Sequence, residues 1–238
     1  ERVITSVMKD DIELFKQFTD NESFKHWMSN TVFELTSAVD HQLYVSSMES
    51  LNRVVPRFNE LPHPARTSLI EGERRFLSET PMLDYSTVMV TFAKAVEICL
   101  EQVIFVPYKS ICDASVNISQ QIETAKENKQ SQATSLFTFL ERGQHLELGS
   151  MAHLLRLCNG RTAEKEHLIG ALRNFIREEL NGATFLDNEN VEAIGLIAKE
   201  FRNPGAHSDV LTKDNAEECR RLCIDVLKSL EPCIAESV

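Results

Sequence analysis

Three side chains near the end of the chain combine the chemistry of proton transfer with that of anion binding. Arg202 and Asn203 are adjacent, and His207 follows Arg202 by five positions. A guanidinium is always charged and presents a donor fork that matches phosphate oxygens. A histidine, with an unperturbed pKa of about 6.5, can serve as general base or acid, and the amide of Asn203 can orient the imidazole or the phosphate. Cleavage of a phosphodiester bond by a neighbouring hydroxyl needs these functions together.

The residues around this group predict a helix that ends in a constrained turn. Apolar residues recur before the turn at steps of three and four, at Val191, Ile194, Ile197, Ala198 and Phe201. This spacing is typical of an amphipathic helix. Pro204 should stop or kink the helix, and Gly205 permits a tight reversal. The alternative is purely structural, with Arg202 and His207 serving only the last-turn carbonyls and the helix dipole.

The segment RNPGAH, from Arg202 to His207, resembles the signature of the HEPN superfamily. That signature is an arginine followed four to six residues later by a histidine, often with a polar residue directly after the arginine. Residues 84–105 (DYSTVMVTFAKAVEICLEQVIF) are similar to the long early helix of such domains, and HLELGSMAHLLRLC resembles helical bacterial defence proteins of the superfamily. In HEPN domains a polar residue of the early helix often supports the active site, and the resemblance gives that role to Glu97. A solvated helix face is the alternative for Glu97.

The resemblance implies a metal-independent endoribonuclease of a bacterial defence or toxin-like system. The nucleophile would be the RNA 2′-hydroxyl, the catalytic residues would be Arg202, Asn203 and His207, and neither a cofactor nor a metal ion would be needed. One histidine does not easily act as both base and acid. The family resemblance therefore also implies a homodimer that brings two motifs together over one cleft.

Composition predicts an all-α protein. The chain has 42% hydrophobic residues, enough for a core, but only 8 glycines and 7 prolines among 238 residues. This leaves few turn residues for a β-sandwich, whereas apolar residues at helical spacing occur in most segments. We expect a helical bundle of HEPN type with a small helical N-terminal extension.

The net charge limits how the chain can bind RNA. The formal charge is −11 and the isoelectric point is near 5.2, which excludes nucleic-acid binding by bulk charge. Contact with an RNA substrate must therefore be local. The expected patch consists of Arg202, Lys213, Arg220 and Arg221.

Cysteine usage and hydropathy favour a cytoplasmic protein without a membrane partner. The six cysteines lie mostly in apolar helical patterns, and none forms a Cys-x-x-Cys pair, so reduced thiols are expected rather than disulfides or a metal site. No apolar run has the length of a membrane span, and no signal peptide is visible. Because the chain begins with Glu1, we expect it to be a piece of a longer protein.

The segment Leu61-Pro-His-Pro predicts a division into an N-terminal helical extension, 1–60, and a HEPN-like helical domain, 61–238. The run DDIELFKQFTDNESFKHWMSNTVFELT resembles the C-terminal part of helicase-type restriction subunits, which implies an N-terminal helicase or ATPase part as a partner in the same protein. The alternative function is then a non-catalytic helical dimerisation or binding module of such an ATPase. In this run Asn21 is expected to cap a helix. The anchors of that helix are Phe24, Trp27, Met28 and Phe33.

Further local features are predicted. Asp84 or Ser86 can cap a helix whose apolar stripe consists of Val88, Phe92, Ala95, Val96, Cys99 and Val103. Pro107 should end this helix, and another helix should run from about 163 to 180. Asp214 and Glu217 form a plausible capping box for the last long helix. His145 shows no partner pattern, so we expect it at the surface or as a satisfied core residue.

Overall fold

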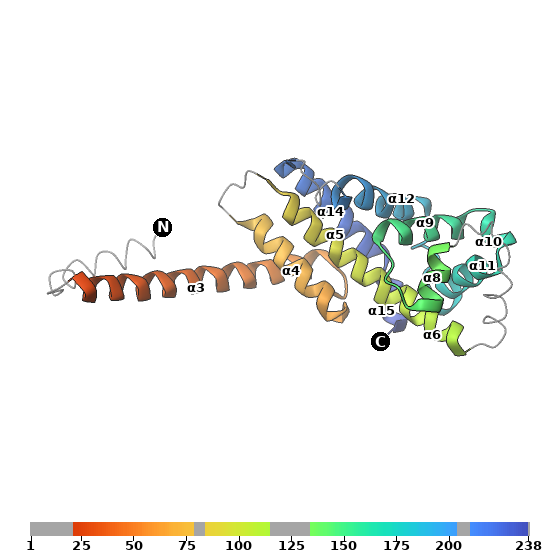
Figure 1. Cartoon of the computed structure of the whole chain (residues 1–238), viewed down its shortest axis with the longest axis horizontal. Coiled ribbons are helices and arrows are strands. Elements are labelled where there is room, and N and C mark those ends of the chain that lie inside the picture. Colours follow the sequence, from red (N-terminus) through yellow and green to blue (C-terminus); the bar gives the residue numbers. More distant parts are fainter. Residues whose placement is uncertain (1–20, 79–83, 115–133, 204–209, 238) are drawn as a thin grey trace. The chain divides into compact units, whose positions relative to one another are not determined.

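The structure is a computed structural model, and every regular element in its described part is helical (Figure 1). The described residues are 21–78, 84–114, 134–203 and 210–237. No strand occurs in these ranges. The predicted all-α class is therefore confirmed.

Contacts divide the chain into one unit up to Val45 and a second from Ser46 to Val238. Helix α3, Asn21–Val54, crosses this border. The predicted division after residue 60 differs from the observed one by residues 46–60, which belong to the second unit.

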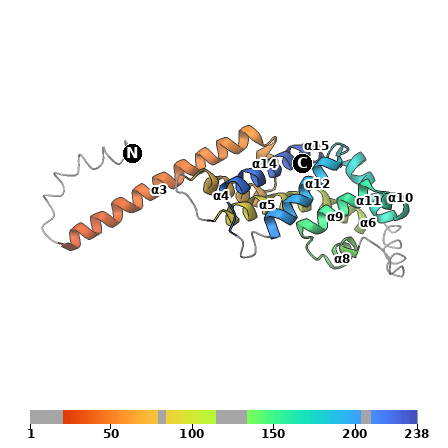
Figure 2. The same ribbon diagram turned by 90° about the horizontal axis from the view of Figure 1, so that it is seen from above.

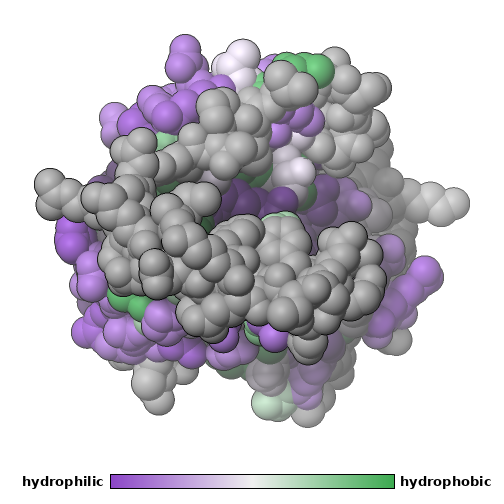
Figure 3. All heavy atoms as spheres, turned by 90° about the vertical axis from the view of Figure 1, so that its left-hand side faces the viewer, coloured by the Kyte–Doolittle hydropathy of each residue, from purple (hydrophilic) through white to green (hydrophobic). Residues whose placement is uncertain are grey.

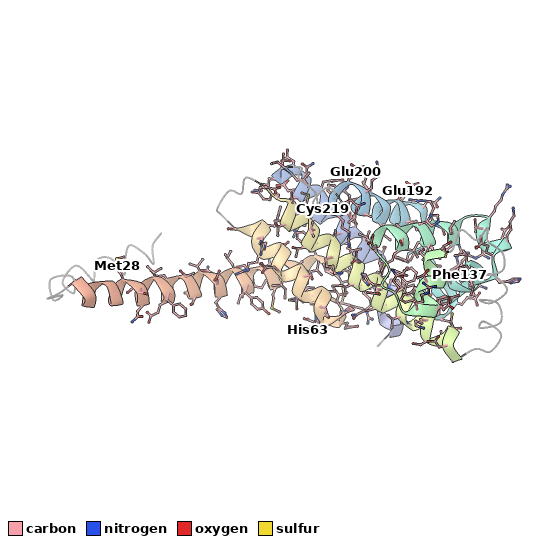
Figure 4. All side chains as sticks on the ribbon, viewed as in Figure 1. Met28, His63, Phe137, Glu192, Glu200 and Cys219 are labelled. Atoms are coloured by element: carbon pink, nitrogen blue, oxygen red, sulfur yellow. The ribbon has the colours of Figure 1, made fainter. Side chains whose placement is uncertain are left out.

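The described part of α3 before the border has no core of its own. Met28, labelled in Figure 4, is 45% exposed, and Phe33 is 73% exposed. The expectation that these two residues anchor a core is therefore wrong. Apolar residues are spread around this helix rather than gathered on one face, so no single apolar stripe is available for burial.

Helix α5, Ser86–Leu100, forms the centre of the second unit. It packs against α4 (His63–Leu77), α9 (Leu148–Asn159) and α14 (Lys213–Ser229), and Figures 1 and 2 both show α4 and α14 beside it. Phe92 and Val96 of α5 are fully buried, as the predicted stripe requires. Burial of each such side chain contributes about 1.5–3 kcal/mol, which explains why the other helices gather around α5.

The remaining elements complete the second unit. They are η1 (Phe58–Glu60), η2 (Glu101–Phe105), α6 (Val106–Ala114), α8 (Thr134–Arg142), α10 (Thr162–Lys165), α11 (His167–Asn174), η3 (Phe175–Glu179), α12 (Asn188–Leu196), η4 (Ile197–Arg202) and α15 (Glu231–Ser237).

The start of α5 is tied to the chain that precedes α14. Asp84 accepts hydrogen bonds from the backbone N–H of Ser86 at 3.0 Å and of Leu211 at 3.1 Å, and the N–H of Tyr85 donates to the carbonyl of Leu211 at 2.9 Å. The hydrogen bonds from Ser86 and Leu211 lower the pKa of Asp84. Asp84 therefore satisfies an open N–H at the helix start, as predicted, and also fixes residue 211 beside α5.

Three segments in the described part, η2, η3 and η4, are π-helical. At η2 the N–H of Val106 donates to the carbonyl of Glu101 five residues earlier, and at η4 the N–H of Asn203 donates to the carbonyl of Ala198.

The prediction that Pro107 ends its helix is wrong, because the helix continues as α6 to Ala114. The wider π turn directly before Pro107 relieves the contact that a proline ring makes with the preceding turn.

The predicted helix over 163–180 is interrupted. Glu166 is extended (φ −105°, ψ 109°) and separates α10 from α11, while η3 follows α11 directly. The predicted stop is correct. Asn181 adopts a left-handed conformation with φ 50°, and the N–H of Gly182 returns to the carbonyl of Ile176 at 2.7 Å, which is the six-to-one bond of a helix C-terminus.

The capping box of α14 lies two residues before the predicted one. The Thr212 hydroxyl accepts from the N–H of Asn215 at 3.3 Å, and the Asn215 side chain accepts from the N–H of Thr212 at 3.0 Å. The prediction with Asp214 and Glu217 is therefore wrong. Threonine and aspartate are both preferred helix caps, although aspartate ranks higher, so a sequence with capping residues at 212 and 214 does not reveal which one begins the helix.

A buried ion pair joins α3, α4 and α14. Arg220 donates from Nε and Nη2 to the two carboxylate oxygens of Glu73, both at 2.6 Å, and the Ser50 hydroxyl donates to Glu73 at 2.6 Å. The Glu73 side chain is fully buried. The Arg220 guanidinium also lies 5.5 Å from the ring centroid of Phe76, over its face. These contacts fix the end of α3 to the bundle.

Candidate functional site

The fully buried carboxylate of Glu97 lies at the centre of the candidate site. Its Oε2 accepts from Nε of Arg202 at 2.8 Å and from the backbone N–H of Leu148 at 3.2 Å. Its Oε1 accepts from Nζ of Lys94 at 2.5 Å and faces Nε2 of His145 at 3.2 Å. Residues from α5, η4 and the start of α9 therefore converge on one side chain.

These four contacts define what Glu97 can do chemically. A carboxylate offers about four lone-pair positions, and here each oxygen has two donors. Glu97 therefore has no open position from which to take a proton from a ligand. Its role is to hold Lys94, His145 and Arg202 in place.

The electrostatic balance keeps Glu97 charged despite its burial. Burial alone would raise the pKa of Glu97. The hydrogen bonds from Lys94 and His145 and the charges of Arg202 and Lys94 outweigh that effect, so the pKa is lowered from its ordinary value. The pair with Arg202 is thus an ion pair at neutral pH.

His145 is the residue that sequence reasoning missed. It lies between α8 and α9, and its Nδ1 is 2.6 Å from Oε1 of Glu101 while its Nε2 faces Glu97. Gly143, at φ 63°, turns the chain after α8, and the buried Leu146 anchors this connection in the core. The predicted surface position of His145 is confirmed, since its side chain is 46% exposed, but its contacts with the two carboxylates were not predicted.

The sequence indicates the two carboxylates that His145 contacts but not the contact itself. Glu97 and Glu101 are four residues apart, so both lie on one face of a helix. Their partner comes from a connecting segment 44 residues beyond Glu101. No periodic pattern reveals such a pairing between a loop and a helix.

The structure brings together two of the four predicted site residues, Glu97 and Arg202. Their contact spans 105 positions of sequence, and Glu97 is the only partner of the Arg202 guanidinium among the described residues. Asn203 follows Arg202 at the end of η4 and is exposed. His207 lies outside the described residues, so its place in the site stays a prediction.

Positive charge lies outermost in this cluster. The side chains of Lys94, His145 and Arg202 are 44%, 46% and 27% exposed, whereas Glu97 is buried. Glu101 is only 19% exposed. On a protein with a net charge of −11, this arrangement presents cationic and imidazole groups to solvent above carboxylates that lie deeper, which suits a phosphate ligand.

Two of the π-helical segments lie in the site. Glu101 is the first residue of η2, and Arg202 is the last residue of η4. Such segments are rare and occur frequently at functional sites. Their wider turns change the direction in which side chains leave the helix, so the positions of Glu101 and Arg202 differ from those in an uninterrupted α-helix.

The predicted basic patch is largely neutralised. Arg220 is bound to Glu73, and Arg221 pairs with Glu218 and Asp225. The described residues on the face in Figure 3 are mostly hydrophilic, with small, separate hydrophobic areas. The cations around Glu97 are therefore better placed for an anionic ligand than those of α14.

The cysteine thiols lie in the core rather than at this site. All six cysteines are buried and none forms a disulfide, and burial raises the pKa of Cys99 to about 12. Within the described ranges, no group of three or more histidine, cysteine or acidic residues is arranged to hold a metal ion. The described helices include none with the length and apolar composition needed to cross a membrane.

Three comparisons with known proteins give no assignment. The chain matches no protein-family model, and it has no significant match among curated proteins or solved structures. Among the chain's own residues, the strongest indication of a site is the ion pair between the buried Glu97 and Arg202, with His145 at its edge.

Proposed function

We propose that this chain is a metal-independent endoribonuclease of HEPN type that acts in bacterial defence or a toxin-like system. The observation that carries the proposal is the 2.8 Å ion pair between Arg202 and the buried Glu97. It links the two segments on which the resemblance to HEPN domains depends, residues 84–105 and 191–207. A buried carboxylate that fixes an arginine five positions before a histidine in the sequence supports a catalytic role over simple helix capping.

The proposed reaction uses the substrate's own nucleophile. His207 takes the proton from the 2′-hydroxyl, whose oxygen attacks the phosphorus. Arg202 stabilises the charge that develops on the phosphoryl oxygens, and Asn203 orients the phosphate or the imidazole. Glu97 holds Arg202 in position. The products are a 2′,3′-cyclic phosphate, or the 3′-phosphate formed from it, and a 5′-hydroxyl. The reaction requires no metal ion or cofactor.

The proposal predicts that His207→Ala will lose most cleavage of total RNA, measured in EDTA beside the wild type. General acid–base catalysis contributes roughly 10²–10⁴-fold, so the rate should fall by that order.

Arg202→Lys keeps the charge but loses the fork and the Nε contact with Glu97, so cleavage should fall while RNA binding changes little. His63→Ala is the control, because this exposed residue lies on the edge of the second unit opposite Glu200 of η4 (Figure 4). Unchanged cleavage by His207→Ala, or loss of wild-type cleavage in EDTA, contradicts the assignment.

We also propose a homodimer, as the resemblance implies, with the helices around 84–105 and 191–207 at the interface. Sedimentation velocity over a concentration series should show a dimer of the 27.0 kDa chain. A monomer at all concentrations at which the enzyme is active would exclude the dimer as a requirement of catalysis.

A second function is favoured by the exposed apolar side chains of α3. Val32, Phe33 and Val39 are each more than half exposed, and because the apolar residues are spread around α3, their burial would need a partner that contacts more than one face of the helix. This supports the alternative of a non-catalytic binding module of a larger helicase- or restriction-type ATPase. The RNA assay separates the two, because a binding module shows no cleavage that depends on His207 or Arg202.

A further inference from the structure

We propose that Lys94 and Arg202 together bind one phosphate group of an RNA strand, and that Glu97 fixes both cations for this task. The inference rests on the proposed ribonuclease function for the class of ligand, and it adds Lys94, which the proposed reaction does not use. It is carried by the contacts of the two cations with the two oxygens of one buried carboxylate. Such binding needs neither cleavage nor a proton carrier.

The shared carboxylate brings the two cations close together. Nζ of Lys94 lies 2.5 Å from Oε1 of Glu97, and Nε of Arg202 lies 2.8 Å from Oε2. The oxygens of a phosphate are spaced much like those of a carboxylate, so one phosphate can span the same two cations. Lys94 belongs to α5 and Arg202 to η4, so the pair exists only where these two elements meet.

Both cations keep N–H donors for a ligand. Among the described residues, Glu97 is the only partner of either side chain. The ammonium group of Lys94 has further N–H bonds, and Arg202 keeps the terminal nitrogens of its fork, which matches phosphate oxygens. Both side chains reach solvent, since Lys94 is 44% and Arg202 27% exposed.

The local charges favour an anion at this position. Glu97 is fully buried and its pKa is lowered, so it stays ionised and holds the cations from below. Two cations and one carboxylate leave a net positive charge where the side chains meet solvent. The second carboxylate of the site, Glu101, is only 19% exposed and faces His145.

Glu97 also reduces the entropic cost of using Lys94. A ligand that binds an unrestrained surface lysine must restrict the rotamers of a long side chain. Lys94 is already held by a short contact with a fully buried residue. Less conformational entropy is therefore lost when a phosphate binds.

A second lysine and arginine that share a carboxylate provide a comparison. Lys228 and Arg221 of α14 both pair with Asp225, which is 45% exposed. A phosphate that approaches this pair meets the negative charge of Asp225 as well as the two cations. The burial of Glu97 is therefore what makes Lys94 and Arg202 the better phosphate site.

The test measures how the full chain binds a fluorescent 2′-O-methyl oligonucleotide, which has phosphodiesters but no nucleophile, at several salt concentrations. Lys94→Met should weaken binding roughly tenfold, as expected when a hydrogen bond to a charged group is lost. Each phosphate contact to a single strand contributes about 0.7 to the slope of log affinity against log salt concentration, so the slope should become shallower by about that amount. Lys94→Arg keeps the charge and should keep the slope.

Lys228→Met is the matched control. Lys228 is 50% exposed and, like Lys94, pairs with a carboxylate three positions away on its own helix. Its replacement should change neither the affinity nor the slope. Inorganic phosphate at constant ionic strength is the second arm of the test. It should displace the oligonucleotide only weakly, because it lacks the neighbouring phosphates of a strand.

Equal salt slopes for wild type and Lys94→Met, or equal effects of Lys94→Met and Lys228→Met, overturn the inference. Loss of binding in both Lys94→Met and Lys94→Arg also overturns it, because the charge is then not what matters. Displacement by inorganic phosphate as efficient as by unlabelled oligonucleotide overturns the assignment to RNA. The ribonuclease function is tested separately. A wild type that cleaves total RNA but binds without Lys94 refutes only the role of Lys94, whereas one that binds through Lys94 and leaves RNA intact refutes only the cleavage.

Discussion

Replacing Glu97 by glutamine is expected to remove most RNA cleavage and to lower the free energy of unfolding by about 1–3 kcal/mol, the cost of leaving buried partners without an acceptor. The amide has nearly the shape of the carboxylate but carries two N–H donors on one side. Whichever way it turns, two of the four donors on Glu97 then face another donor. Arg202 would lose its fixed position, and urea unfolding and the RNA assay measure the two effects.

The same variant has a defined pH dependence. The pKa of Glu97 in the folded protein lies below its ordinary value of 4.5. A carboxylate with a lowered pKa contributes stability that is present above its unfolded pKa and is lost as the pH falls through its folded pKa. The difference in unfolding free energy between wild type and Glu97→Gln should therefore be largest near neutral pH and shrink below about pH 4.5.

Glu200→Gln is the matched control for Glu97→Gln. Glu200 lies on η4 close to Arg202, but it is exposed and pairs with Lys199. Its replacement should change stability by less than about 0.5 kcal/mol. If Glu97→Gln is as stable and as active as this control at neutral pH, the central role of Glu97 is refuted.

The second large effect is expected for Arg220→Ala, which should lower the free energy of unfolding by about 3–5 kcal/mol because it leaves a buried charge uncompensated. Glu73 is fully buried, and Arg220 is 21% exposed. Of the contacts described above, Glu73 would keep only the hydrogen bond from the Ser50 hydroxyl. Chemical denaturation at neutral pH measures the loss.

Arg221→Ala is the control for this experiment, since Arg221 is the next residue of α14 and pairs only with the exposed Glu218 and Asp225 among the described residues. Such surface pairs contribute about 0–1 kcal/mol. The double replacement Glu73→Leu with Arg220→Leu should recover much of the stability that Arg220→Ala loses. Equal stability of Arg220→Ala and Arg221→Ala would show that the Glu73 pair does not hold α3, α4 and α14 together.

Much of the fold was predictable because it depends on periodicity. The stripe through Phe92 and Val96 predicted α5, and the stripe through Val191 and Phe201 predicted the helix that carries Arg202; both helices are present. Neither pattern fixes the number of residues per turn within a helix, so the π segments were not predicted. The prediction that Pro107 ends its helix was wrong for this reason, because it assumed regular α-helical geometry before the proline.

The candidate site was predictable only in part. Arg202 was named for its chemistry and spacing and Glu97 because of a family resemblance, and the two are in contact. His145 was not named, because its role depends on a connecting segment that the core holds in place through Leu146. A contact of this kind is decided by tertiary packing, which the sequence pattern does not encode locally.

The contacts of Glu97 also determine at which stage of folding the site forms. Its partners His145 and Arg202 are 48 and 105 positions away along the chain, and contacts between distant positions form only after long loops have closed. During synthesis a chain that has not yet been extended to Arg202 lacks this guanidinium, and a partly folded chain does not hold it in place. The proposed nuclease would therefore have no active early intermediate that attacks the RNA of the cell while the chain is being produced. RNA cleavage in an assay would then report that the second unit is completely folded.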